Sequence, residues 1–135
     1  MEKVFVDTDI ILDVLSKRDP FYKFAAHLFS KADKRELEIG VSSLSFSNLN
    51  YLLSKKYGVI ETRKILLRFK ALVSVMTVDD KIIELALGSD FKDFEDAIQY
   101  YCAIENGYKT LLTRNLKDYK KANIPIMTAE SFVKN

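Results

Sequence analysis

The feature that most constrains the fold is the opening segment of the chain, residues 1–15. The apolar run Val4-Phe5-Val6 ends in Asp7-Thr8-Asp9, and apolar residues at helical spacing follow from Ile10 to Leu15. This order indicates a buried strand that turns directly into a helix. In an open α/β sheet, ligands bind at the carboxyl end of such a strand. A partly buried aspartate at that end needs a partner, which a bound cation can supply.

Length and composition indicate one domain. A chain of 135 residues with 48% hydrophobic content is large enough for a single core, so we expect residues 1–135 to form one unit. No stretch approaches the roughly 18 apolar residues of a membrane span, and the N-terminus lacks the pattern of a signal peptide. We therefore expect a cytoplasmic protein with no membrane association. The lone Cys102 lies in an apolar run, which favours a buried thiol over a nucleophile.

Short extended segments alternate with helical ones along the chain, the pattern of a parallel sheet with helices on both faces. The expected strands cover residues 3–6, 38–41, 72–76, 110–112 and 126–127. The expected helices cover about 9–17, 20–33, 45–57, 60–71, 79–87 and 93–106, with a short helix at the C-terminus. The predicted architecture is a three-layer α/β/α domain with a mostly parallel sheet of four or five strands.

Acidic residues follow several of these elements. Asp7 ends the first strand, Asp93 and Asp96 open one helix, and Asp118 lies just beyond the strand that ends at Thr113. Right-handed crossovers bring the carboxyl ends of parallel strands to one edge of the sheet, so these carboxylates are expected to converge there. Hard divalent ions relieve the repulsion among such groups, and they promote hydrolysis of phosphodiesters.

Three segments carry a family resemblance. The residues Asp7-Thr8-Asp9, Asp93-Phe94-Glu95-Asp96-Ala97-Ile98 and Leu111–Tyr119 resemble PIN domains in order and spacing over nearly the whole chain. The resemblance implies an α/β/α ribonuclease that uses Mg2+ or Mn2+ held by acidic residues. Many PIN domains are VapC-type toxins, so it also implies an RNA substrate, a small antitoxin partner and a homodimer.

The resemblance assigns roles to individual residues. Asp7 matches the first metal ligand of the family, and Asp96 matches the acid from the later helix. Thr8 and Asp9 fall where the family usually has a hydroxyl and an asparagine, and Thr113 takes a small hydroxyl position. These three residues are expected to contact the substrate or to support the ligands.

Two positions depart from the family pattern. The usual second acid falls on Asn48, and the fourth acidic position falls on Asn115, with Asp118 available nearby as a substitute. An amide offers a neutral oxygen but removes a negative charge, so metal affinity is expected to be weaker. Asp7, Asp96 and Asp118 are the expected catalytic residues, and Asp93 is a further candidate ligand.

Structural roles are alternatives for the same residues. Asp9 and Asp93 suit helix N-caps, Asn115 with Asp118 suits the start of a helical turn, and Asn48 suits a buried amide. Asp13, one turn after Asp9, is expected to be solvated.

Basic residues cluster near the predicted acidic edge and are expected either to position a phosphate backbone or to form a solvated face: Arg114, Lys117, Lys120 and Lys121.

Two other functions fit parts of the sequence. A phosphatase of the haloacid dehalogenase type also begins with a strand and Asp-x-Asp, but Ile10 stands where that family has glycine. The stronger alternative is a PIN fold with impaired catalysis that binds RNA or a protein partner, because amides occupy two acidic positions. The preferred hypothesis is a metal-dependent endoribonuclease, which a titration with divalent metal and RNA would distinguish from the alternative.

Overall fold

Strand β1 (Lys3–Val6) lies at the centre of the fold, with other strands on both sides. In this computed structural model, which describes residues 1–135, β1 pairs with β2 (Glu38–Ser42) and with β4 (Leu111–Leu112). β3 (Ser74–Met76) and β5 (Ile126–Met127) form the edges, so the strand order is β3-β2-β1-β4-β5. Every pairing is parallel. The predicted parallel sheet is confirmed, and it has five strands.

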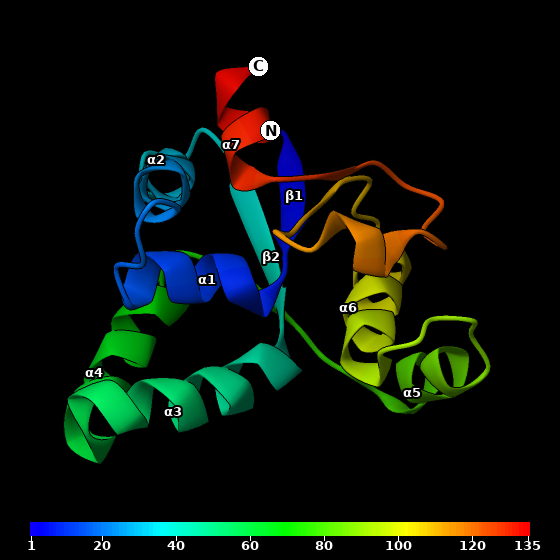
Figure 1. Ribbon diagram of the computed structural model, residues 1–135, viewed down its shortest axis with the longest axis horizontal. Coiled ribbons are helices and arrows are strands. Elements are labelled where there is room, and N and C mark those ends of the chain that lie inside the picture. The colour runs from blue at the N-terminus through cyan, green and yellow to red at the C-terminus, as the bar shows by residue number, and fades with distance from the viewer.

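Helices fill the segments between strands and cover both faces of the sheet (Figure 1). Before β3 the helices are α1 (Thr8–Leu15), α2 (Tyr22–Asp33), α3 (Ser43–Tyr57) and α4 (Val59–Lys70). After β3 they are α5 (Asp80–Leu87), α6 (Phe94–Glu105), the 3-10 helix η1 (Leu116–Tyr119) and α7 (Ala129–Lys134). The predicted three-layer α/β/α architecture is therefore confirmed. None of these helices combines the length and the apolar character needed to cross a membrane.

Helix boundaries follow local signals in the sequence. The side chains of Asp79 and Asp93 each accept a hydrogen bond of 3.0 Å from the backbone N–H three residues later, and so cap α5 and α6. Gly58 ends α3 with a φ of 81°, a conformation that glycine adopts without strain. The strand expected from Leu72 begins later, because the Leu72 N–H donates to the carbonyl of Phe69 and continues the turn that ends α4.

Alternate side chains of β1 enter two separate hydrophobic cores. Val4 and Val6 belong to a cluster of 17 buried residues that the sheet shares with α1, α2, α3 and α4. Phe5 points to the opposite face and belongs to a cluster of 11 residues built largely from α5 and α6. Figure 1 shows these two groups of helices on opposite sides of the sheet. Strand β1 is covered on both faces and both edges. The Asp7 side chain, which follows directly after it, is therefore buried.

Tyr108 ties the loop after α6 to the sheet. A Cβ atom on Gly40 of β2 would lie 2.3 Å from Cζ of Tyr108, so only glycine leaves room for the ring. The buried Tyr108 hydroxyl donates to Oε2 of Glu38 at 2.8 Å, and the ring packs edge-on against Phe5 with centroids 5.5 Å apart. The loop that leads into β4, and hence to the carboxyl edge, is fixed by this contact.

Gly40→Ala is expected to destabilise the protein by about 1–3 kcal/mol, because the added methyl overpacks the site against the Tyr108 ring. Urea unfolding of the full chain measures the change. Gly88→Ala is the matched control, since its Cβ would make only ordinary contacts with the carbonyl oxygens of Glu84 at 3.6 Å and Leu85 at 4.0 Å, and it is expected to change stability by less than about 0.5 kcal/mol. Equal losses in the two variants would contradict the steric explanation.

Candidate active site at the carboxyl edge of the sheet

A hollow of about 430 Å3 opens where the carboxyl end of β1 meets α1, α3 and the first turn of α6. Four carboxylates line it: Asp7, Asp9, Glu95 and Asp96. Among the residues singled out from the sequence, the hollow also contains Thr8, Asn48 and Arg114. The structure thus brings Asp7 and Asp96 together from distant parts of the chain, and it adds Glu95, which the sequence analysis did not identify as a site residue.

Asp7 is the most buried of these acids and is held by three donors. Its Oδ1 accepts a hydrogen bond from the Thr8 N–H at 2.7 Å, which makes Asp7 the N-cap of α1. Its Oδ2 accepts from the hydroxyls of Thr113 and Tyr119, both at 3.0 Å. Burial raises the pKa of Asp7 and the charge of Asp9 raises it further, while the three hydrogen bonds act in the opposite direction. Its negative charge is therefore only partly compensated.

Asp9 does not cap the first helix, and that expectation was wrong because Asp7 occupies the cap. The side chain of Asp9 instead turns to the loop after β4. Its Oδ2 accepts hydrogen bonds from the Arg114 N–H at 3.0 Å, from Thr113 Oγ1 at 3.3 Å and from Asn115 Nδ2 at 3.3 Å. Its Oδ1 is buried and has no hydrogen-bond partner. The Thr113 hydroxyl has a single hydrogen, so it can donate to only one of Asp7 and Asp9 at a time.

Asp96 lies in the first turn of α6, partly exposed to the hollow. Its carboxyl group has a pKa raised to about 7, first by burial and then by the charges of Asp7, Asp93, Asp118 and Asp9. Asp93 accepts the Asp96 N–H at 3.0 Å, so the capping role considered for Asp93 is confirmed. At neutral pH, Asp96 is a carboxyl group poised between its protonated and ionised forms.

Asp118 is not in the hollow that contains Asp7. It is exposed on η1 and shares with Asp93 a neighbouring hollow of about 270 Å3, which four lysines also line: Lys92, Lys117, Lys120 and Lys121. The Asp118 N–H bonds the Asn115 carbonyl at 3.0 Å, which confirms the turn expected at this point. The Asn115 side chain reaches back to Asp9. Asp118 therefore does not line the acidic hollow, but its negative charge raises the pKa of Asp96.

Asn48 is half-buried on α3 and faces the hollow rather than the core. Its Nδ2 donates to Oε2 of Glu95 at 3.4 Å, across the gap between α3 and α6. The alternative of a buried amide was therefore wrong, because Asn48 is only half-buried and lines the hollow. The contact between Asn48 and Glu95 could not be predicted from local sequence, because it depends on how α3 and α6 pack in space.

A polar floor beneath the acids was also missed. Gln99 is 2% exposed, and its Nε2 donates to Ser45 Oγ at 3.1 Å and to Thr8 Oγ1 at 3.3 Å. The hydroxyls of Thr8 and Ser45 are themselves 2.8 Å apart. The Gln99 Oε1 atom is buried without a partner. The sequence does offer one indication of the role of Gln99. Gln99 lies one turn after Asp96, which places both side chains on the same face of α6.

Asp13 is buried rather than solvated, and that expectation was wrong because two arginines compensate its charge. Asp13 is 2% exposed, and its oxygens lie 3.0 Å from Arg18 Nη2 and 2.9 Å from Arg114 Nε. The Arg114 guanidinium also stacks on the Phe21 ring at 4.0 Å. These contacts place the Arg114 guanidinium beside Asp13, whereas the sequence analysis expected Arg114 either to position a phosphate backbone or to be solvated.

The donor set fits a hard divalent cation. None of the four carboxylates that line the hollow forms a salt bridge, and the buried Asp9 Oδ1 has no partner. The oxygen-only set matches the preference of Mg2+ or Mn2+. No three acidic, histidine or cysteine side chains are close enough together to enclose an ion, so a cation here would rely on water for part of its coordination.

Comparison with known proteins agrees with this geometry. A model of the PIN domain family matches residues 3–117. Ribonuclease VapC1 from Aquifex aeolicus (strain VF5) is 31% identical over 139 residues, which cover 97% of this chain and 93% of the relative.

Solved structures share the fold at lower identity. VapBC2 from Rickettsia felis, bound to a DNA fragment from its promoter, has a TM-score of 0.67 and 21% identity over 93% of this chain and 96% of that chain. VapC20 from Mycobacterium tuberculosis, a Sarcin-Ricin loop cleaving toxin, has a TM-score of 0.64 and 19% identity over 80% of this chain and 86% of that chain. The matched segment includes β1, α3, α6 and the loop after β4, all of which build the hollow. The chain belongs to the PIN domain family.

Proposed function

We propose that this protein is a metal-dependent endoribonuclease and the toxin of a toxin–antitoxin pair. The observation that carries the proposal is the hollow in which Asp7 and Asp96 converge without forming an ion pair to either of the two arginines that also line it. The ribonuclease activity named for the VapC1 relative supports the reaction, and the VapBC complexes among the structural neighbours support the partner.

Asp7 and Asp96 would hold Mg2+ or Mn2+, with Asp9 beside them. The chemistry that such an ion supplies when bound is polarisation of a phosphoryl oxygen and formation of hydroxide near neutral pH. Tyr119 and Thr113 fix the carboxylate of Asp7 through two hydrogen bonds, and burial keeps the Tyr119 hydroxyl protonated by raising its pKa. In the metal-free protein the pKa of Asp96 is raised to about 7, so Asp96 must release its proton before it can serve as a ligand. Asp118 and Asp93 act on it through their charges.

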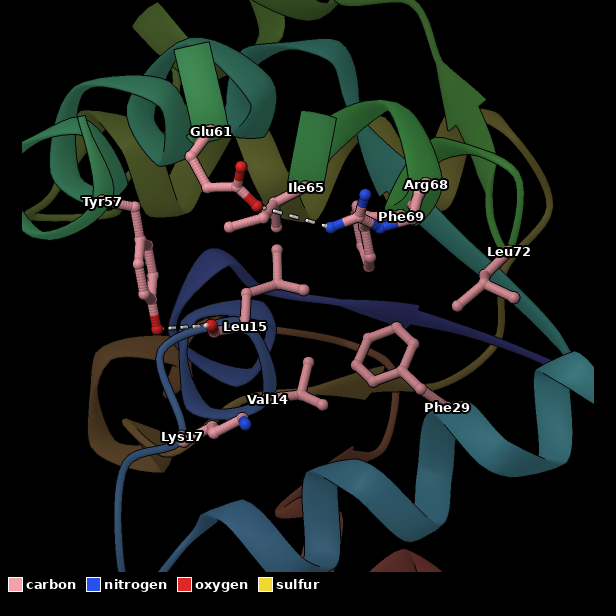
Figure 2. A pocket seen from close by; sticks show the side chains of 10 residues that line it. All are labelled: Val14, Leu15, Lys17, Phe29, Tyr57, Glu61, Ile65, Arg68, Phe69 and Leu72. Atoms are coloured by element: carbon pink, nitrogen blue, oxygen red, sulfur yellow. Dashed lines mark hydrogen bonds and ion pairs between the residues drawn. The ribbon is translucent and has the colours of Figure 1, made fainter. Parts of the chain in front are cut away.

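The antitoxin would occupy a groove that is separate from the acidic hollow. Figure 2 shows this groove of about 430 Å3, where side chains of α1, α2 and α4 converge on an apolar floor that includes Leu15, Phe29 and Phe69. Glu61 and Arg68, 3.9 Å apart, stand on its rim. An apolar floor with a charged rim suits the apolar face of an amphipathic helix.

A second surface supports the homodimer. Three large apolar side chains of α3 and α4 are exposed to 64%, 75% and 72% of their area: Tyr51, Ile60 and Leu67. Exposed apolar groups of this size are typical of protein–protein contact surfaces. Light scattering of the purified chain measures the oligomeric state.

Asp7→Asn is expected to reduce Mn2+-dependent cleavage of a fluorescent RNA by at least about 100-fold, because the variant loses one of the two carboxylates that would hold the ion. The fold should remain intact or become more stable, since repulsion with Asp9 is relieved. Thermal melts with and without Mn2+ should lose the metal-induced rise in Tm. Asp33→Asn, on the exposed end of α2, is the control and should behave as the wild type. An unchanged metal-induced shift in Asp7→Asn would identify Asp7 as a helix cap only.

The stability of the metal-free protein is expected to fall as pH rises from 5 to 8. The Asp96 pKa is raised from 3.8 to about 7, so the folded state binds more protons than the unfolded state over that interval. Asp96→Asn should lose less unfolding free energy between pH 5 and pH 8 than the wild type does, as measured by urea unfolding in EDTA. The Asp33→Asn control should keep the full loss. Identical pH dependence in wild type and Asp96→Asn would contradict the assignment of this carboxyl group.

Ile65→Glu is expected to prevent copurification with a coexpressed antitoxin of the proposed kind, because it buries a charge in the groove of Figure 2. RNA cleavage by the isolated variant should be unchanged, since the groove shares no residue with the acidic hollow. Leu87→Glu, an exposed position on α5, is the control and should retain the partner. Loss of the partner in both variants would contradict the assignment of the groove.

The alternative, a catalytically impaired PIN fold, makes a different prediction. A wild-type chain that binds Mn2+ and RNA but leaves the RNA intact at saturating metal would establish the binding module and overturn the nuclease.

A further inference from the structure

We propose that a pocket next to the acidic hollow receives one base of the RNA, with guanine preferred. This aromatic pocket of about 190 Å3 lies where the start of α2, the loop after β4 and the start of α7 meet, and its wall includes Phe21, Phe24, Arg114, Asn115 and Thr128. The inference rests on the RNA substrate proposed above and names the part of it that this chain would recognise.

Arg114 joins the aromatic pocket to the acidic hollow. It is the one residue that lines both cavities. The next residue, Asn115, lines the aromatic pocket and donates through Nδ2 to Oδ2 of Asp9 in the acidic hollow at 3.3 Å. The two cavities are therefore neighbours, and an RNA strand with a phosphate in the acidic hollow has an adjacent base beside the aromatic pocket.

The aromatic pocket has the size and the rings that suit one base. A cavity of about 150 Å3 holds a benzene ring. A pocket of about 190 Å3 therefore admits a single planar ring system but not a helix. Unpaired RNA bases bind by stacking on aromatic rings and on arginine planes. Both are present here, since Phe21 is 39% exposed and the Arg114 guanidinium lies on its ring at 4.0 Å.

The Arg114 side chain has hydrogen-bond donors to spare. Its Nε lies 2.9 Å from Oδ2 of Asp13 and forms an ion pair, but the buried Nε–H has no hydrogen-bond partner. The one hydrogen bond that Arg114 donates comes from its backbone N–H. The Thr128 hydroxyl accepts from the Ser131 N–H at 3.1 Å, and its own hydrogen is free to donate. The wall of the aromatic pocket is therefore rich in unused donors.

Unused donors favour a base with two adjacent acceptors. Guanine presents O6 and N7 to the fork of an arginine, whereas adenine carries an amino donor in place of O6. Arg114 is therefore expected to distinguish guanine from adenine, while the Phe21 ring stacks with any base.

Positive charge around the aromatic pocket favours nucleic acid over an apolar protein segment. The Nζ atoms of Lys23 and Lys134 lie 5.0 Å and 5.4 Å from the centroid of the Phe24 ring. Glu130 on the same wall is already paired with Lys134 at 2.7 Å, and the buried Asp13 is paired with two arginines. A phosphate backbone is attracted to such a surrounding.

The test measures RNA binding by fluorescence anisotropy in EDTA, so it requires neither metal nor cleavage. The probes are two labelled octamers of uridine that carry one central guanine or one central adenine. The wild type is expected to bind the guanine octamer about five-fold or more tightly than the adenine octamer. Arg114→Lys keeps the charge and loses the fork, so the ratio should fall to about one. Arg63→Lys, exposed on α4 outside both cavities, is the matched control and should keep the ratio.

Phe21 variants separate stacking from base recognition. Phe21→Leu is expected to weaken binding of both octamers by about five-fold or more and to keep their ratio, because stacking does not depend on the base. Phe21→Tyr keeps the ring and should bind as the wild type. Thermal melts report whether each variant folds.

Two results would overturn the proposal. One is a wild type without preference for guanine, or a preference that Arg114→Lys retains in full. The other is a Phe21→Leu variant that binds both octamers as the wild type does and instead fails to copurify with a coexpressed antitoxin, because the aromatic pocket would then be a protein contact.

Cleavage of the same octamers in Mn2+ separates this inference from the proposed function. If the wild type prefers guanine through Arg114 but leaves the RNA intact, the inference stands and the nuclease is wrong. If it cleaves both octamers and binds them equally, the inference alone is wrong. A wild type that neither binds nor cleaves RNA overturns both.

Discussion

The rest of the carboxyl edge depends on the burial of one carboxylate at the end of the central strand. Asp7 is 8% exposed because β1 has neighbours on both edges and cores on both faces. An ionised group in that position needs donors, and Thr8, Thr113 and Tyr119 supply them from three different segments of the chain. The loop after β4 and the 3-10 helix η1 are thereby fixed against the first strand, which gives the hollow a rigid wall.

The arginines near this edge form their ion pairs with Asp13 and not with the carboxylates of the hollow. Arg18 and Arg114 both pair with Asp13, one turn along α1 from Asp9, and Arg114 is stacked on Phe21. Arg114 donates its backbone N–H to Asp9, and its positive charge lowers the Asp9 pKa against the larger effect of burial. The carboxylates of the hollow therefore form no ion pair, and burial first, then the charges of neighbouring aspartates, raise the pKa values of Asp7 and Asp96.

Sequence reasoning predicted what is encoded locally. The strand and helix order, the cap Asp93 and the helix end at residue 57 were accessible, since each depends on a few neighbouring residues. The role of Asp13 and the contact between Asn48 and Glu95 were not, because they depend on which helices meet in space. The capping of α1 was assigned to Asp9 instead of Asp7, because both residues suit a cap and only the tertiary contacts of Asp9 decide between them.

The position of the hollow connects metal binding to the stability of the whole domain. Asp7 follows the central strand, Asn48 belongs to a helix that packs in one core, and Glu95 and Asp96 belong to a helix that packs in the other. An ion held by Asp7 and Asp96 would join the central strand to α6 across the end of the sheet. Its binding free energy would therefore oppose separation of the layers, by about 2.7 kcal/mol when free metal is 100 times its Kd. Without it, the like charges of Asp7, Asp9 and Asp96 face each other, so this edge lowers the stability of the metal-free fold when the carboxylates are ionised.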